Sequence, residues 1–326
     1  MRHVILDWSS SQYRCIHAAK KIYDDGLAKL EVIFDDPNEL YRIYKRLLLR
    51  ELIDHIKMFN PDNFVVALDS KSWRHDFYDK YKGNRDKVRD ESAIDFTKFF
   101  EIADIYLTEL QSVFKCLRFI KVDKAEADDS IAILCKKRFM NDDVVMIALD
   151  KDLNQLLTNP KHRRWNVRAP GEDKFAIVDD PRHELTLKVI CGDAGDFIFN
   201  VMHLDESKYP IDGKRIGLGE VTAELILKED KFLESDYVVE KVSKKYKTLS
   251  SNTIIEEVKA NYQRNLKLID FNHIPVEIEE AILNKYDEYQ IEECDMKSLF
   301  RMAMSLGEDK IASDMNNLKS LFDKMV

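Results

Sequence analysis

The chain has 326 residues, of which 45% are apolar, so it is long enough to bury a core and is not globally disordered. Its net charge of −9 argues against binding nucleic acid unless the acidic residues are gathered away from the contact face. The five cysteines and eight histidines form none of the close pairs used in zinc sites, so any metal would have oxygen ligands, as Mg²⁺ and Mn²⁺ do. The longest apolar run, VVMIAL, is too short for a membrane span, and the N-terminus lacks the features of a secretory signal. We therefore expect a cytoplasmic protein that does not bind membranes.

Short apolar runs alternate with longer amphipathic segments along the first half of the chain. Buried strands are predicted at 3–6, 64–68, 117–122 and 144–149, and helices at 37–59, at 92–114 and after 126. This alternation predicts an α/β fold with a mainly parallel central sheet flanked by helices. In such sheets the ligand binds beyond the carboxyl ends of the strands.

Acidic residues follow each predicted strand. They are Asp7 after the first strand, Asp69 after the second, Glu126, Asp128 and Asp129 after the third, Asp150 and Asp152 after the fourth, and Asp193 and Asp196 further along. A single aspartate at a strand end is more often a helix N-cap than a ligand. Four consecutive strand ends with acids instead predict a cluster that needs cations to stay ionised. These nine acids equal the formal excess of negative charge, so the remaining surface is balanced.

The segment DKAEADDSIAIL (123–134) crowds three carboxylates against the start of a helix. An acid in a first helical turn gains about 0.3–1 kcal/mol from the helix dipole. Two carboxylates about 4–5 Å apart repel by roughly 3–4 kcal/mol at an effective dielectric constant near 20. Taken alone, the segment is equally consistent with helix capping and with metal binding.

A basic stretch interleaved with aromatic residues lies just after Asp69. Its basic residues are Lys71, Arg74, Lys80, Lys82, Arg85, Lys87 and Arg89, and its aromatic residues are Trp73, Phe77, Tyr78 and Tyr81. This composition fits a path for single-stranded nucleic acid, bound through backbone charge and base stacking. The alternative is a solvated charged helix whose aromatic side chains pack inward. We favour the first interpretation because the stretch adjoins the acidic residues.

The segment GKRIGLGEVTAELIL (213–227) predicts a tight turn before a helix. Lys214 and Arg215 precede Gly217 and Gly219, and backbone N–H groups at such a turn can bind phosphate without reading base sequence. The pattern resembles a helix-hairpin-helix, although a plain turn between helices also fits.

The last twelve residues, MNNLKSLFDKMV, place Leu318, Leu321 and Phe322 on one helical face. Two interpretations are open for this tail. It is either a peptide that binds a sliding clamp or, as is more common for such a pattern, the last helix of the core.

Six segments together resemble the 5′-nuclease (flap endonuclease) family, and within it the phage ribonuclease H branch. In chain order they are SWRHDFYDKYKGNR (72–85), EADDSIA (126–132), DKDLNQL (150–156), GDAGD (192–196), GLG (217–219) and NLKLIDFNHIP (265–275). The resemblance implies a 5′-nuclease/PIN-like catalytic domain over 1–185, with a basic arch at about 70–91. It also implies a helical domain over 186–326 that contains the helix-hairpin-helix.

The resemblance also assigns roles to individual residues. The nine acids match the positions that would bind two Mg²⁺ ions, for which Mn²⁺ can substitute, and a monovalent cation is expected at the hairpin. Arg74, Lys82 and Arg85 match the basic positions of the arch, with Tyr81 as the aromatic residue beside them, and these four are predicted to be catalytic. The residues predicted to bind DNA are Lys71, Lys80, Lys87, Arg89, Lys214, Arg215, Gly217 and Gly219. Phe197 departs from the family pattern, which has Asn after the second acid of GDAGD.

The implied activity is metal-dependent 5′→3′ hydrolysis of phosphodiesters at the 5′ ends of RNA/DNA hybrids and duplex DNA, including flaps. The implied role is removal of lagging-strand primers during replication by a monomer, in the host cytoplasm if the source is viral. A single-stranded-DNA-binding protein and a sliding clamp are the expected partners.

Three alternatives explain less of the sequence. A PIN-type ribonuclease shares the acidic site but leaves the basic arch and the hairpin unexplained. A D-x-D phosphatase needs a small hydroxyl residue after the second aspartate, and DKDLN lacks one. A catalytically silent, structure-specific DNA-binding protein would be expected to lack some of the acids.

Overall fold

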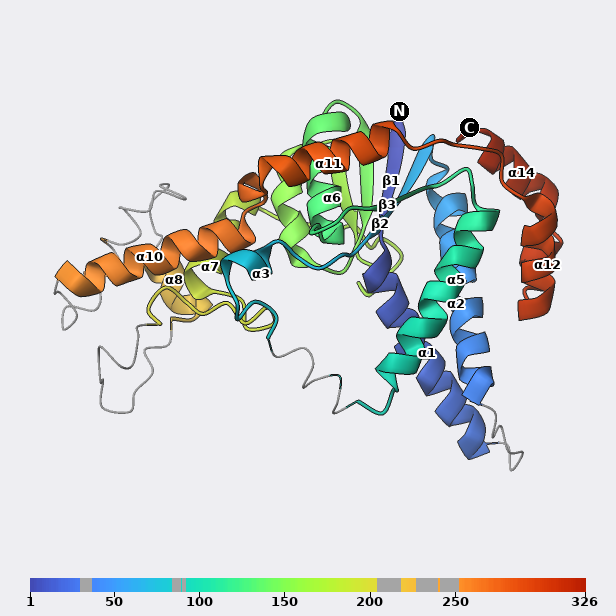
Figure 1. Cartoon of the computed structure of the whole chain (residues 1–326), viewed down its shortest axis with the longest axis horizontal. Helices are drawn as coiled ribbons and strands as arrows, with labels where there is room; N and C mark the ends of the chain where they lie inside the picture. The colour runs from blue at the N-terminus through green and yellow to red at the C-terminus, as the bar shows by residue number, and fades with distance from the viewer. Residues whose placement is uncertain (30–36, 84–88, 90–91, 204–217, 227–239, 241–251) are drawn as a thin grey trace.

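The central element of the computed structural model is a five-stranded parallel sheet with strand order β3-β2-β1-β4-β5 (Figure 1). The structure describes residues 1–29, 37–83, 89, 92–203, 218–226, 240 and 252–326. The strands are β1 (Arg2–Asp7), β2 (Asn63–Leu68), β3 (Arg118–Lys121), β4 (Asp143–Ile147) and β5 (His162–Trp165). The first four confirm the predicted strands. The fifth was missed because its sequence, HRRW, is too polar to indicate a buried strand.

Helices cover both faces of the sheet, as a parallel sheet requires. On one face lie α1 (Trp8–Lys29), α2 (Pro37–Phe59) and α5 (Phe96–Val113), packed on Val4 and Leu6 of β1. On the other face α6 (Ala127–Ile133), the π-helical turn η1 (Leu134–Arg138), the 3₁₀ helix η2 (Lys151–Thr158) and α11 (Val276–Asp287) pack on Ile5. Successive residues of β1 thus enter opposite cores, which follows from the two-residue period of a strand.

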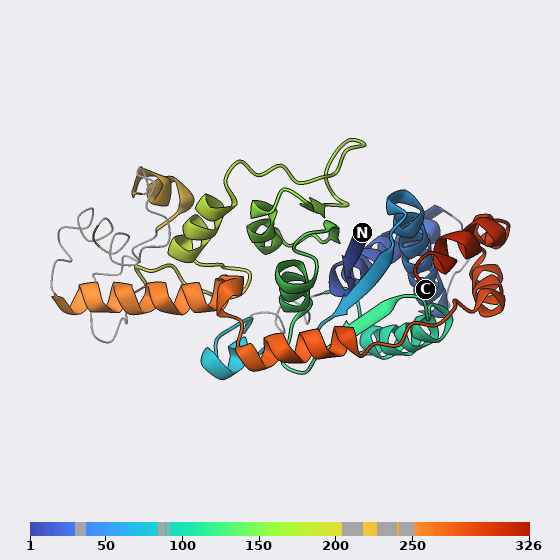
Figure 2. The same cartoon turned by 90° about the horizontal axis from the view of Figure 1, so that it is seen from above.

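A third core lies at the end of the molecule away from the sheet (Figure 2). It joins α7 (Pro181–Cys191), α8 (Glu220–Ile226) and α10 (Asn252–Ile269), and it includes Tyr81 from the segment after α3 (Arg74–Phe77). The short 3₁₀ helix η4 (Phe271–His273) then leads into α11, which returns the chain to the sheet. The predicted helical C-terminal region is therefore present. The predicted boundary at 185/186 falls within α7, and the division into two domains stays a prediction.

The tail is the last core helix. After α12 (Met296–Leu306) and α13 (Asp309–Ala312), helix α14 (Met315–Asp323) buries Leu318 and Phe322, whose side chains are 0% and 1% exposed. The Phe322 ring lies 5.8 Å from that of Phe114. The clamp-binding interpretation of the tail is therefore wrong, because the residues that would enter a clamp are already inside the protein.

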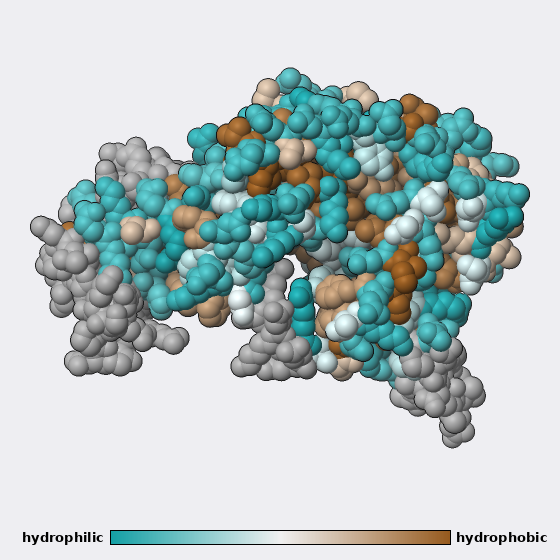
Figure 3. Space-filling model, viewed as in Figure 1, coloured by the Kyte–Doolittle hydropathy of each residue, from teal (hydrophilic) through white to brown (hydrophobic). Residues whose placement is uncertain are grey.

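Hydrophilic residues cover most of the described surface on the face shown in Figure 3, which is hollowed between the segment around α3 and helices α1 and α5. Within the described ranges, no helix combines the length and apolar character needed to span a bilayer.

Candidate metal centre

Four aspartates line one cleft beyond the carboxyl ends of the strands, where the parallel sheet predicts a site. Asp7 ends β1, Asp69 follows β2, Asp150 follows β4, and Asp128 lies in the first turn of α6. The cleft has a volume of about 1000 Å³ and is also lined by Lys82, Arg89 and Arg168. Its floor is thus acidic and its rim carries positive charge.

These four carboxylates carry more negative charge than their surroundings neutralise. Burial and the neighbouring Asp69 raise the pKa of Asp7 to about 6, although Ser9 and Ser10 donate hydrogen bonds to it. Burial, followed by the charges of Asp150, Asp7 and Asp69, raises the pKa of Asp128 well above its ordinary value. A cation in the site would offset this repulsion and favour the ionised form of Asp128.

The Oδ1 atom of Asp128 supplies a direct test of whether the residues fit a metal. This oxygen is buried and has no hydrogen-bond partner among the described residues. A buried carboxylate oxygen without a donor is costly, and a divalent cation with oxygen ligands would remove that cost. The donor set around Asp128 therefore fits Mg²⁺ or Mn²⁺ better than a soft metal.

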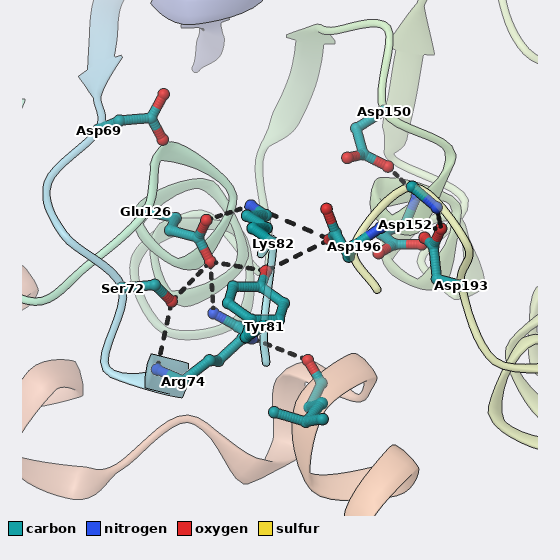
Figure 4. A network of polar contacts seen from close by, with 12 residues as sticks. Asp69, Ser72, Arg74, Tyr81, Lys82, Glu126, Asp150, Asp152, Asp193 and Asp196 are labelled. Carbon is teal, nitrogen blue, oxygen red and sulfur yellow. Dashed lines mark hydrogen bonds and ion pairs between the residues drawn. The ribbon is translucent and has the colours of Figure 1, made fainter. Parts of the chain in front are cut away.

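Asp152 and Asp193 form a second group of acids (Figure 4), and Lys188 of α7 pairs with both. Its Nζ contacts Asp152 and lies 2.6 Å from Oδ2 of Asp193. Burial and the charge of Asp150 raise the pKa of Asp152 to about 7, although Lys188 acts in the opposite direction. Sequence reasoning missed Lys188. The only available signal was a lone lysine on a helix, five residues before Asp193.

Glu126 is the centre of a third group (Figure 4). Its carboxylate accepts hydrogen bonds from Ser72 Oγ at 2.7 Å, Tyr81 Oη at 3.0 Å and Arg74 Nη1 at 3.0 Å, and it contacts Lys82 Nζ. Burial alone would raise the pKa of Glu126, but the charges of Lys82 and Arg74 lower it to about 2. Glu126 is therefore an anion that cationic side chains already neutralise.

Arg74 and Asp129 form a buried ion pair with each other. Arg74 is 4% exposed and donates to both oxygens of Asp129, at 2.8 and 3.0 Å. Its Nε donates to the carbonyl of Leu268 in α10 at 2.7 Å. Asp129 is fully buried and also accepts the backbone N–H of Glu126, which completes a capping box. Neither residue lines the cleft, because their side chains form an ion pair with each other.

Lys82 and Tyr81 lie where the sequence places them, beside the acids. Lys82 has a left-handed backbone with φ of +55°, and its N–H donates to the carbonyl of Asp196 at 2.9 Å. A non-glycine residue in this conformation is held by its surroundings, as is common at functional sites. Lys82 Nζ is 3.9 Å from Asp196, and Tyr81 Oη is 3.3 Å from it.

Phe197, which departs from the family pattern, also has a left-handed backbone, with φ of +59°. Asparagine adopts this conformation more readily than phenylalanine, which accounts for the usual residue there. The loop nevertheless keeps its turn, and Asp193 and Asp196 remain beside Lys188 and Lys82.

Of the predicted DNA-binding residues that the structure describes, Arg89 lines the cleft and Lys71, Lys80 and Gly219 do not. Arg89 donates to the Tyr13 hydroxyl at 3.1 Å, Lys80 lies 5.9 Å from the centre of the Phe199 ring, and Lys71 is exposed. Gly219 directly precedes α8. The other four predicted DNA-binding residues lie outside the described part of the chain, and so does Arg85, which was predicted to be catalytic; the four are Lys87, Lys214, Arg215 and Gly217.

Within the ranges that the structure describes, no three acidic, histidine or cysteine side chains are placed so that they would hold one ion as they stand. Lys82 and Lys188 lie among the acids instead. Metal binding therefore requires the carboxylates to turn toward a common point. The assignment of the nine acids to two ions stays a prediction.

Comparison with known proteins agrees with this architecture. The family model for the 5′-3′ exonuclease, N-terminal resolvase-like domain, matches residues 2–181. Ribonuclease H of Enterobacteria phage T4 is 26% identical over 283 residues, which cover 82% of this chain and 84% of the relative. The 5′-3′ exonuclease of Mycoplasmopsis pulmonis is 27% identical over 204 residues, which cover 58% of each chain.

Two solved structures from phage T5 share the fold over nearly the whole chain. The T5 5′-exonuclease with bound zinc ions has a TM-score of 0.55 and 19% identity, and the match covers 98% of this chain and 100% of that one. A T5 flap endonuclease complex with DNA and metal ions has a TM-score of 0.57 and 18% identity, with the same coverage. Because the family model spans more than half of the sequence, the chain belongs to the 5′-3′ exonuclease family with the N-terminal resolvase-like domain.

Proposed function

We propose that the chain is a Mg²⁺-dependent 5′→3′ nuclease that hydrolyses phosphodiesters at the 5′ ends of duplex DNA and RNA/DNA hybrids, flaps included. Its cellular role would be removal of lagging-strand primers. The observation that carries the proposal is the buried Oδ1 of Asp128, which has no hydrogen-bond partner among the described residues and lies among Asp7, Asp69 and Asp150, in a chain of this family. A PIN-type ribonuclease is disfavoured because the matching family model is that of 5′-3′ exonucleases and the match to the phage T4 enzyme covers 82% of this chain.

Two metal ions are proposed, with Mn²⁺ able to replace Mg²⁺. Asp7, Asp69, Asp128 and Asp150 would hold the first ion, and Asp152 and Asp193 would contribute to the second. When bound, the ions would lower the pKa of an attacking water and stabilise the leaving oxygen. Glu126 and Asp196 lie at the edge of this set, where they pair with Lys82.

Lys82 is the residue that we propose for direct contact with the reacting phosphate. It lines the cleft, and its ammonium group lies between two carboxylates at the edge of the acidic floor. A fixed cation there would stabilise the negative charge that develops on the phosphate oxygens during hydrolysis. Arg74 would act differently, because its guanidinium is buried. It would hold Asp129 and Glu126 in position through its ion pairs with them.

Several finer features belong to the same proposal. The basic residues after Asp69 and the turn at Gly219 would bind the substrate backbone, and a monovalent cation would bind at the hairpin. The protein would act as a monomer with a single-stranded-DNA-binding protein and a sliding clamp as partners. The division into a catalytic domain (1–185) and a helical DNA-binding domain (186–326) is likewise proposed.

The test is cleavage of 5′-labelled nicked and flapped duplexes, one version with RNA at the 5′ end, in Mg²⁺, in Ca²⁺ and in chelator. We expect short 5′ products in Mg²⁺ alone, and none from Asp128→Asn, which should still bind the duplex. Asp143→Asn is the matched control, because Asp143 is exposed at the opposite end of β4. If the unaltered chain binds the duplexes but cleaves none of them in Mg²⁺ or in Mn²⁺, the proposal is wrong and the protein is a structure-specific DNA-binding protein.

A further inference from the structure

The loop that carries Asp193 and Asp196 is closed by a narrow stem. The backbones of Asp193 and Ile198 exchange two hydrogen bonds, at 2.8 and 2.7 Å, and Asp193 Oδ1 accepts the N–H of Gly195 at 2.8 Å. At the base of the stem Gly192 has φ of +74°, and a Cβ there would collide with the carbonyl of Ile198. Two chain segments therefore cross in direct contact where the loop begins and ends, so a shift of the stem moves both aspartates.

Asn265 of helix α10 bonds to both sides of this stem. Its Nδ2 donates to the carbonyl of Val189, before the loop, at 2.9 Å, and to the carbonyl of Phe199, after the loop, at 2.8 Å. Arg264 donates to the Oδ1 of Asn265 from Nε at 3.0 Å and from Nη2 at 2.8 Å. Both amide hydrogens and the amide oxygen are in use, so the side chain has one orientation.

The surroundings make this asparagine unusual. Asn265 is 0% exposed, and the cluster packed around it contains Val189, Tyr262 and Leu268. An apolar residue would suit such a position unless a buried amide had a specific task, because burying an amide is favourable only when all its hydrogen bonds are made. The task visible here is to fix the two carbonyls that flank the loop.

We propose that Asn265 is a positioning residue that sets the place of Asp193 and Asp196 in the metal centre. The inference rests on the proposed function, since it gives these aspartates a role in metal binding. The loop has further contacts with the site: Asp193 pairs with Lys188, and the Asp196 carbonyl accepts the N–H of Lys82. Without Asn265, Arg264 Nη2 still donates to the carbonyl of Phe199 at 3.1 Å, but the bond from α10 to the Val189 carbonyl, on the other side of the stem, is lost. Both aspartates are then held less firmly relative to Asp152 and Glu126.

The chain offers a matched control one turn earlier on the same helix. Asn261 is also buried, at 8% exposure, and donates to the carbonyls of Val201 and His203 at 3.1 and 2.9 Å. These carbonyls lie beyond the stem. Asn261→Leu therefore removes the same kind of side chain and the same number of donated hydrogen bonds while leaving the stem attached to α10 through Asn265. It also removes the bond that Asn261 Oδ1 accepts from Arg264 Nη1 at 2.7 Å.

The experiment compares Asn265→Leu, Asn261→Leu and Asp193→Asn by three measurements. These are Mn²⁺ binding by electron paramagnetic resonance, hydrogen exchange of the amides at 193–198, and kcat and KM on a flapped duplex. For Asn265→Leu we expect faster exchange in the loop, Mn²⁺ affinity at the weaker site reduced by at least about tenfold, as in Asp193→Asn, and a lower kcat with little change in KM. Asn261→Leu should leave all three close to those of the unaltered chain.

Unchanged loop exchange and unchanged Mn²⁺ affinity in Asn265→Leu would overturn the proposal, as would equal losses in Asn261→Leu. If Asn265→Leu does not fold, Asn265→Ser, which retains one donor, is measured in the same way against the same outcomes. Failure of the proposed function has a different signature. The unaltered chain would then bind no Mn²⁺ and cleave nothing, while loop exchange in Asn265→Leu would still report whether Asn265 anchors the stem.

Discussion

Removal of divalent metal should make the stability of the protein depend on pH in an unusual direction. Asp7 and Asp152 have pKa values raised to about 6 and about 7 in the folded chain, from an ordinary 3.8. A carboxyl whose pKa is higher in the folded state binds protons more tightly when folded. Its contribution to stability is complete below pH 4 and is lost as the pH rises through the folded value. The metal-free protein should therefore be more stable at pH 5 than at pH 8.

The size of the effect follows from the two pKa values. The pKa of Asp7 lies about one pH unit above pH 5, and that of Asp152 about two pH units above it. Each pH unit corresponds to about 1.4 kcal/mol of stability lost as the pH rises to 8. These two carboxyls should lower the free energy of unfolding by roughly 4 kcal/mol over this interval in chelator. Burial lowers the pKa of His55 to about 4, so this imidazole raises stability by about 2 kcal/mol between pH 5 and pH 6.5, and the net fall should be about 2 kcal/mol. Glu126 does not interfere, because its lowered pKa, about 2, affects stability only at pH values below this window.

The assay is urea unfolding at pH 5 and at pH 8, at constant ionic strength, in chelator and in Mg²⁺. Mg²⁺ should raise stability far more at pH 8 than at pH 5, because protons compete with the metal for the same carboxylates. Asp128→Asn, which removes one of the crowded charges, should flatten the pH dependence in chelator, whereas Asp143→Asn should not. A metal-free protein that is equally stable at both pH values would refute the reasoning.

Three further outcomes are expected. Lys82→Ala should lower single-turnover cleavage by at least about a hundredfold with little change in duplex affinity measured in Ca²⁺, and equal losses in both would remove its catalytic role. Arg74→Met should lower the free energy of unfolding by about 3–5 kcal/mol, because it leaves the Asp129 charge buried alone, and the double variant Arg74→Met/Asp129→Leu should recover most of that loss. Urea unfolding measures the stability of the single and the double variant. If Arg74→Met is as stable as the unaltered chain, Arg74 and Asp129 do not form a buried ion pair. Phe322→Ala should cost about 3–5 kcal/mol by the same measurement, whereas the exposed Lys319→Ala should stay within about 0.5 kcal/mol, and similar values for the two would contradict the burial of the tail.

The sheet and the acidic floor of the cleft were predictable because local pattern and global geometry agree. Apolar runs that end in aspartate, such as HVILD, encode both the buried strand and the position of its carboxylate, and parallel pairing brings these strand ends together. The helix at 37–59 was equally clear from its periodicity.

Other features depend on contacts between residues far apart in the sequence. Arg74 is predictable as a basic residue near the site, but its burial depends on Asp129 and on the Leu268 carbonyl, 194 residues away. Lys188 is a single lysine on a helix, and nothing local distinguishes it from a solvated side chain. Asn265 begins the segment NLKLIDFNHIP that carries the family resemblance, but nothing local indicates that its amide is buried. Helix α1 begins with WSSSQ and, over residues 8–26, buries only Cys15, Ile16 and Ala19 besides Trp8 among its apolar residues, which gives a weak helical pattern.

The central claim is that the aspartates around Asp128 bind divalent metal ions for cleavage at 5′ ends. The most direct measurement is anomalous X-ray diffraction from crystals soaked in Mn²⁺, which locates the ions without reference to activity. We predict a strong peak among Asp7, Asp69, Asp128 and Asp150, a second near Asp152 and Asp193, and displacement of Lys188 from between the latter two. Mn²⁺ peaks found only outside the cleft, with Lys82 and Lys188 still paired to their carboxylates, would show that these aspartates do not bind the metal.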